Sequence, residues 1–107
     1  MKQHAEEIIK IKVAISLRHL LKQNKEYSQN VGKIDEIINS YEKIAIHSDM
    51  RKATVSQAFN GVTRTAMTTI VLIIEAMNFT LVDFSKIYEE ISEKQIDDFK
   101  KNLDKKV

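Results

Sequence analysis

The chain contains no proline and only two glycines, Gly32 and Gly61, among its 107 residues. Because these two residue types interrupt helices more strongly than any others, a chain with so few of them is expected to be all-α. Hydrophobic residues make up 43% of the sequence, which is enough to bury a core and excludes a disordered chain. The length is that of one domain.

Composition also restricts the cellular compartment in which the chain is expected to function. The absence of cysteine excludes a disulfide framework and a thiolate metal site, and suits a reducing compartment. The longest dense apolar run, Ile70 to Ile74, is too short to span a bilayer, and the N-terminus has early glutamates in place of the apolar core of a signal peptide. We therefore expect a cytoplasmic protein that has no membrane association.

An enzyme is not indicated. His4, His19 and His47 show no metal-ligand spacing, and the sequence has neither a phosphate-binding glycine loop nor an evident pair of carboxylates in an apolar pocket. We expect no catalytic residue, no metal and no cofactor.

Hydrophobic periodicity predicts five helices followed by a tail. The expected helices cover residues 5–24, 33–47, about 50–60, 66–77 and 81–91. Polar loops are expected at 23–32 and 62–65. The helix at 66–77 is apolar almost all round, so it is expected at the buried centre of the fold. The tail from residue 92 is either a solvated helix or disordered, and a frayed helix is favoured. The resulting division is a domain over 1–92 and a charged tail over 93–107.

The predicted helix ends depend on individual capping residues. Gly32 is a possible helix stop, and Gly61 permits the positive φ that ends the third helix. Asp49 is expected to be the N-cap of that helix, because its short side chain can accept hydrogen bonds from the first turn. Asn78 is expected to stop the fourth helix, and Thr80 to cap the fifth.

The segment 40–61, SYEKIAIHSDMRKATVSQAFNG, carries the functional prediction. It has the pattern of two short helices joined by a tight polar break at Ser48 and Asp49. The second helix has an apolar inner side that includes Val55 and Ala58. Its outer face is basic and amide-rich, has no acid, and fits a DNA groove. That face consists of Arg51, Lys52, Ala53, Thr54, Ser56 and Gln57.

The distribution of charge along the chain supports DNA binding more strongly than the net charge does. The formal net charge is only +2, but no Asp or Glu occurs between Met50 and Ile74, where Arg51, Lys52 and Arg64 all lie. Excluding acids from one local surface lets a nearly neutral protein approach phosphate groups.

These residues resemble the helix-turn-helix of the Cro/lambda-repressor-type regulators, the XRE family. The resemblance covers about 40–85. Ile44-Ala45 is similar to the family's Leu-Ala, Thr54 to Ser56 to the middle of its recognition helix, and Asn60-Gly61 to its exit turn. The end of the family's sequence pattern is similar to a stretch further along this chain, which consists of Ile70 to Ile74, Ala76 to Phe79, Leu81 and Phe84.

Three departures from the family pattern stand out. Asp49 replaces the usual glycine of the turn, so we expect a left-handed aspartate there. Ser48 replaces the usual leucine, which thins the packing between the two helices. The segment before Tyr41 is longer than is typical, and we expect it to extend the second helix backwards.

The resemblance implies a five-helix Cro/lambda-repressor-like domain that binds double-stranded DNA sequence-specifically as a homodimer. It further implies a transcriptional regulator that reads the major groove with the helix at about 50–60, for which repression is the prior expectation. By position, the base-contacting residues are Arg51, Lys52, Ala53, Thr54 and Gln57. The phosphate-contacting residues are Tyr41, Ser56, Asn60, Thr63 and Arg64.

Two alternatives stay open at the level of sequence. Tyr41 is nearly as well suited to core packing as to a phosphate contact. The whole chain could instead be a protein-interaction module of the same fold, antitoxin-like or anti-repressor-like, in which the long first helix docks a partner.

The apolar residues of the first and fifth helices and the tail are candidates for a dimer surface, although a small domain needs most of its apolar residues inside. They are Ile8, Ile11, Ile15, Ile87, Tyr88, Ile91, Ile96 and Phe99.

Overall fold

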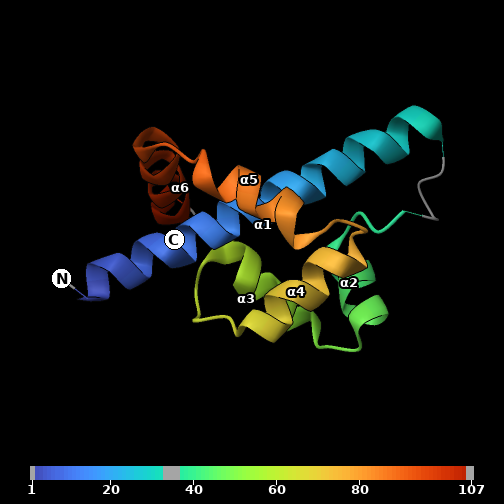
Figure 1. Ribbon diagram of the computed structural model, residues 1–107, viewed down its shortest axis with the longest axis horizontal. Helices are drawn as coiled ribbons and strands as arrows, with labels where there is room; N and C mark the ends of the chain where they lie inside the picture. Colours follow the sequence, from blue (N-terminus) through green and yellow to red (C-terminus); the bar gives the residue numbers. More distant parts are fainter. Residues whose placement is uncertain (1, 33–36, 106–107) are drawn as a thin grey trace.

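The computed structural model describes residues 2–32 and 37–105, and within them the chain forms six α-helices and no strand. The helices are α1 (Lys2–Val31), α2 (Tyr41–Ser48), α3 (Lys52–Asn60), α4 (Met67–Ala76), α5 (Leu81–Glu89) and α6 (Glu93–Lys105) (Figure 1). The all-α prediction is confirmed. The described residues contain one helix more than expected, because the tail forms α6.

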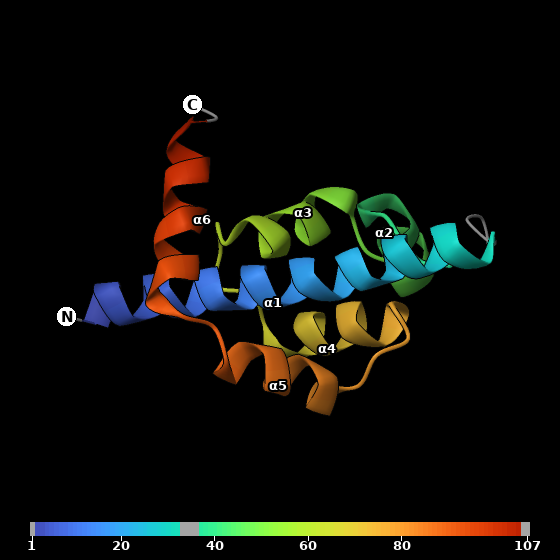
Figure 2. The same ribbon diagram turned by 90° about the horizontal axis from the view of Figure 1, so that it is seen from above.

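Helix α1 runs the length of the molecule and organises the other elements. Its 30 residues span about 45 Å at 1.5 Å per residue, and the longest extent of the molecule is 44 Å. Helices α3, α5 and α6 all pack against α1, and α2 packs against α3 and α4. Figure 2 shows α6 crossing the N-terminal half of α1 at a steep angle.

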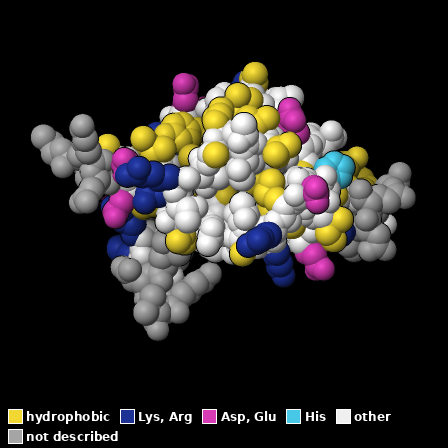
Figure 3. Space-filling view, turned by 90° about the horizontal axis from the view of Figure 1, so that it is seen from below, with side chains coloured by type: hydrophobic (Ala, Val, Ile, Leu, Met, Phe, Trp, Pro, Cys, Tyr) yellow, Lys and Arg dark blue, Asp and Glu magenta, His cyan; other side chains and the backbone are white. Residues whose placement is uncertain are grey.

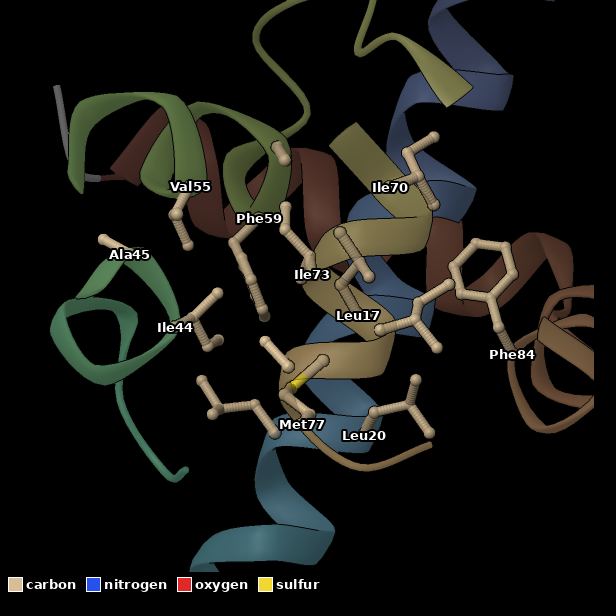
Figure 4. Close-up of a cluster of buried hydrophobic side chains, with 14 residues drawn as sticks. Leu17, Leu20, Ile44, Ala45, Val55, Phe59, Ile70, Ile73, Met77 and Phe84 are labelled. Carbon is tan, nitrogen blue, oxygen red and sulfur yellow. The ribbon is translucent and has the colours of Figure 1, made fainter. Parts of the chain in front are cut away.

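The main core is formed by buried apolar side chains from α1 to α5, which point toward one another in Figure 4. They are Leu17, Leu20, Leu21, Ile44, Ala45, Val55, Ala58, Phe59, Ile70, Ile73, Ile74, Ala76, Met77 and Phe84. The central position predicted for the apolar helix is confirmed for α4. One side of α4 nevertheless faces solvent, where Leu72 is 46% exposed and Met67 is 57% exposed.

The predicted loop at 23–32 is wrong, because α1 continues to Val31. Its buried face passes from Leu20 to Asn24 and Ser28, each one helical turn further on. The Asn24 side-chain amide donates to the carbonyl of Ile38 at 2.8 Å and to that of Met77 at 2.9 Å. The inner face is therefore completed by polar groups whose partners lie in distant segments, which apolar periodicity cannot reveal. Gly32, at φ 70, ends the helix as predicted.

The second helix begins at Tyr41. The predicted helix at 33–47 is therefore wrong for residues 37–40, and its residues 33–36 lie outside the described residues. Residues 37–40 are non-helical and are bound by side chains of α1, since Ile38 accepts from Asn24 and the Asn39 amide donates to the Ser28 hydroxyl at 3.2 Å. Ser40 is extended and caps α2 by accepting from the Lys43 amide at 3.2 Å.

Asp49 ends α2 and does not cap α3, so its predicted N-cap role is wrong. Its φ of 54 is left-handed, which confirms the conformation expected where the family pattern has glycine. The Met50 amide donates to the carbonyl of Ala45 at 3.0 Å, which is the bond that closes a Schellman motif. Because the chain at 49–50 is used to end α2, α3 starts only at Lys52, with Arg51 as an N-cap that makes no side-chain hydrogen bond.

Gly61 ends α3 as predicted, at φ 66. A β-carbon at this position would lie 3.2 Å from the carbonyl oxygen of Lys10, so glycine also permits the close approach of the α3 exit to α1. The loop at 62–65 is confirmed.

Helix α4 stops one residue before the predicted end, and Asn78 follows it at φ 66. Thr80 caps α5 as predicted, and the Asp83 carboxylate completes a capping box by accepting from the Thr80 amide at 2.9 Å. The helix ends at Glu89, before the predicted Ile91. Leu81, at the start of the helix, is 42% exposed.

The tail is a docked helix, so the expectation of fraying is wrong over the described part of α6. Phe99 is only 7% exposed and packs with Ile11 and Ala14 of α1, and the Arg18 guanidinium lies 4.6 Å from the centre of its ring. Ile15 and Ile96 pack around this second cluster, while Ile87 and Tyr88 pack on the main core. Most of the apolar residues considered for a dimer surface are thus used inside the monomer.

Among the described residues, no single helix is long and apolar enough to cross a membrane. Helices α4 and α5 reach the required length and composition only as a pair bent by 107°, and α4 lies in the core of this fold.

Candidate nucleic-acid interface

Helix α3 is anchored along one side and open along the other. Val55 and Phe59 are fully buried and Ala58 is 1% exposed, at positions that recur along the inner side of the helix. Of the five predicted base-contacting residues, Arg51, Lys52, Ala53 and Gln57 are exposed and Thr54 is half-buried. The predicted reading surface is therefore accessible on a helix whose backbone is held in place by the core.

The end of α3 is held by Arg18 of α1, a residue that sequence reasoning missed. Its Nε donates to the carbonyl of Phe59 at 2.7 Å, and its Nη2 donates to Oδ1 of Asn60 at 2.6 Å. The Asn60 amide donates in turn to the Ser56 hydroxyl at 3.1 Å. Two of the predicted phosphate-contacting residues, Asn60 and Ser56, are thus bonded to each other within the protein and fix the C-terminal turn of α3.

Tyr41 packs on the core and also lines an open groove, while its predicted phosphate contact stays a prediction. Its ring lies 4.6 Å from the ring of Phe59, measured between centroids, and this contact joins the start of α2 to the buried side of α3. The residue is only half-buried, and it lines the open groove described next.

A basic groove runs between α1 and the α2–α3 pair. It consists of two adjoining hollows of about 450 Å³ and 250 Å³ that share Leu21, Lys25 and Tyr41 as lining residues. Cations from two helices line it, with Glu42 as its one acidic lining residue. The cations are Arg18, Lys22, Lys25 and Lys52.

The α1 cations of this groove were missed because the functional prediction was centred on residues 40–61. Their spacing is the signal that could have found them, since residues 18, 22 and 25 recur at helical intervals and must share one face of the long helix.

Thr63 and Arg64, the remaining predicted phosphate-contacting residues, lie in the loop after α3 and line a different hollow. The Arg64 guanidinium donates to the Glu6 carboxylate of α1 at 2.7 Å. The structure therefore does not bring these two residues into the basic groove, and Arg64 already has a carboxylate partner.

The electrostatic character of the interface is local. Figure 3 shows the face formed by α2, α3 and α4, where charged side chains of both signs occur in small separate groups among hydrophobic and uncharged ones. The first turn of α3 has no acidic residue and no side-chain cap, so the positive end of its helix dipole lies beside Lys52. Within the described ranges, no cluster of three or more His, Cys, Asp or Glu side chains could hold a metal ion.

Comparison of the chain with protein-family models, with curated proteins and with solved structures found no match.

Proposed function

We propose that this chain is a sequence-specific regulator that binds double-stranded DNA, a cytoplasmic repressor of the XRE type in which α3 enters the major groove. The observation that carries the proposal is the arrangement of α3. Its inner side is fully buried, while Lys52, Ala53 and Gln57 project outward without any acidic neighbour on the helix.

The exposed side chains of α3 match the chemistry of base edges. The Gln57 amide can pair in a bidentate manner with adenine, and Lys52 or Arg51 can donate to O6 and N7 of guanine. The Ala53 methyl group suits contact with a thymine methyl. Because Arg18 and Gly61 fix the end of α3 against α1, the backbone that carries these side chains has little freedom to lose on binding.

The basic groove supplies the phosphate contacts in this proposal. Lys22 and Lys25 are exposed along α1 beside the half-buried Tyr41, and the uncapped amide groups at the start of α3 add donors. Phosphate contacts of this kind position a protein on the duplex and make binding sensitive to salt.

The working form in this proposal is a homodimer. One helix of nine residues reads few base pairs, whereas two copies on half-sites one helical turn apart multiply the specificity.

The proposal is tested by fluorescence anisotropy with a pool of random DNA duplexes at two salt concentrations, followed by selection and sequencing of the bound fraction. We expect binding that weakens with salt and enriches a palindromic sequence. The double variant Lys52→Glu, Gln57→Ala should lose about 100-fold or more in affinity for the selected duplex, because each good base contact contributes about 1 to 3 kcal/mol.

The matched control is Lys94→Glu, Asn102→Ala, which changes the same charge and removes one amide on the exposed side of α6. It should bind DNA as the unchanged protein does, and circular dichroism should show that both variants are folded. Full DNA affinity in the α3 double variant would overturn the assignment of α3. The absence of binding at low salt by the folded protein would favour the partner-binding alternative.

A further inference from the structure

A cavity lies beside the exit of α3 and the N-terminal half of α1. Its volume is about 190 Å³, and its walls are contributed by Ile9 and Val13 of α1, Ala58 of α3 and Ile70 of α4. These four side chains are aliphatic, and the other lining residues are Glu6, Lys10, Thr63, Arg64 and Thr65. Ile9 is 50% exposed, so the cavity opens to solvent past an apolar side chain.

The size of the cavity limits what can occupy it. An apolar protein cavity of about 150 Å³ accepts benzene, so a cavity of about 190 Å³ has room for one ring or one short branched alkyl group. A peptide segment or a larger cofactor would extend out of its open side into solvent.

The charged residues that line the cavity are the cations Lys10 and Arg64 and one acid, Glu6, so an anionic head group is favoured there. The Arg64 guanidinium donates to the Glu6 carboxylate at 2.7 Å, and the two side chains are 78% and 43% exposed. Such a pair is weak because water competes with it. A ligand carboxylate can replace Glu6 on Arg64 with the same geometry, after which Glu6 returns to water without becoming a buried unpaired charge.

We propose that this cavity is a binding site for a small apolar carboxylate, with the apolar group against Val13, Ala58 and Ile70 and the carboxylate on Arg64. An occupant touches Ala58, which lies on the buried side of α3. The site thus goes beyond the proposed function and places a ligand directly behind the helix proposed to read DNA. Its test needs no DNA, so the two proposals can fail separately.

The experiment is a titration of the ¹⁵N-labelled chain of residues 1–107 with phenylacetate, followed by NMR. Phenylacetamide, which has the same ring and no charge, is the matched ligand control. We expect saturable shifts at Val13, Thr63 and Ile70, with a Kd on the order of 1 mM for a ligand of this size. Phenylacetamide should bind about fivefold more weakly.

Two variants of the charge pair should change phenylacetate affinity in opposite directions. Arg64→Gln removes the partner of the ligand carboxylate and should weaken binding about fivefold. Glu6→Gln removes the competing carboxylate and should strengthen binding by about twofold to fivefold. Lys94→Gln, an exposed cation on α6, should leave the affinity unchanged.

The proposal is overturned if the folded protein shows no saturable shift at the cavity residues. It is also overturned if phenylacetate and phenylacetamide bind equally, or if Arg64→Gln and Glu6→Gln have the same effect as Lys94→Gln. Opposite changes in the two charge-pair variants, with the shifts confined to the cavity, are the supporting result.

Discussion

At the scale of single residues, buried polar side chains hold distant segments in position through hydrogen bonds, which apolar packing cannot form. Asn24 is 8% exposed, and its side-chain amide donates to the carbonyls of Ile38 and Met77. Ile38 lies in the segment before α2, and Met77 lies at the end of α4. Only the side-chain amides of Asn and Gln donate two hydrogen bonds from one nitrogen and accept at their oxygen, and Asn is the shorter of the two. The irregular segment before α2 and the end of α4 are therefore held at defined positions on α1.

We expect Asn24→Ala to lower the free energy of unfolding by about 2 to 3 kcal/mol, because it leaves two carbonyl groups without their donor. Urea unfolding followed by circular dichroism measures the change. Gln23→Ala, an exposed neighbour on the same helix, is the control. A loss smaller than about 0.5 kcal/mol, the usual range for exposed positions, would contradict this role of Asn24.

Asp83 makes part of the stability depend on pH. Its pKa is held below the ordinary value mainly by the hydrogen bond from the Thr80 backbone amide, with further contributions from the Thr80 hydroxyl and the charge of Lys86. Because the pKa is lower in the folded state than in the unfolded chain, the carboxylate stabilises the fold at neutral pH. This contribution is lost as the pH falls from about 4 through the lowered folded-state pKa.

Asp83→Asn should therefore be less stable than the unchanged protein at pH 7, and the difference should disappear in acid. Urea midpoints measured from pH 7 down to the acid limit of folding follow the change. Ser85→Ala, a neutral substitution on the same helix, should show an effect that does not vary with pH. A difference for Asp83→Asn that stays constant across the series would exclude the charged capping box as its cause.

At the scale of elements, the ends of the helices were set by hydrogen bonds more than by propensity. The turn between α2 and α3 is an example, because Asp49 has the composition of an N-cap and yet its backbone completes α2. Both uses need the same residue type, and only the position of the Met50 amide, bonded to Ala45, decides between them.

Helix α6 is a separate packing unit. Its buried Phe99 belongs to a small cluster with Ile11 and Ala14 that is distinct from the main core, and α1 is the helix it packs on. Elements joined to a fold through one small cluster open at lower free energy than the core does. The contact of Phe99 with Arg18 nevertheless links α6 to the residue that holds the end of α3.

We expect Phe99→Ala to remove the protection of α6 amides against hydrogen exchange while α4 and α5 keep theirs, because the ring is the main buried contact of α6. Hydrogen exchange measured by NMR resolves the two regions. Asp98→Ala, at an exposed position beside it, should leave α6 protected. An equal loss of protection throughout the chain would mean that α6 unfolds together with the main core.

At the scale of the whole molecule, α1 brings together groups from segments distant in sequence. Its C-terminal half contributes Lys22 and Lys25 to the groove beside Tyr41, and its N-terminal half contributes Glu6 and Ile9 to the cavity behind α3. Both surfaces meet at α3, which lies against the middle of α1. A net charge of only +2 is thus compatible with a locally basic groove, because the cations are arranged by one helix face.

The sequence by itself determined the helical class, the central place of α4, the stops at Gly32 and Gly61, and the capping of α5 by Thr80. These features follow from local chemistry, since apolar runs, positive φ and capping side chains act within a few residues. The exposure of Arg51, Lys52, Ala53 and Gln57 also followed from helical spacing around the buried Val55.

The tertiary structure alone decided the extension of α1 to Val31, the irregular path at 37–40, the docking of α6 and the roles of Arg18 and Asn24. In each case the deciding partner is distant in the chain: Arg18 bonds residues about 40 positions further on, and Asn24 reaches Met77. Polar side chains are buried only where folding brings hydrogen-bond partners from distant parts of the chain next to them. Local pattern therefore assigns them to the surface, and the folded chain places them inside.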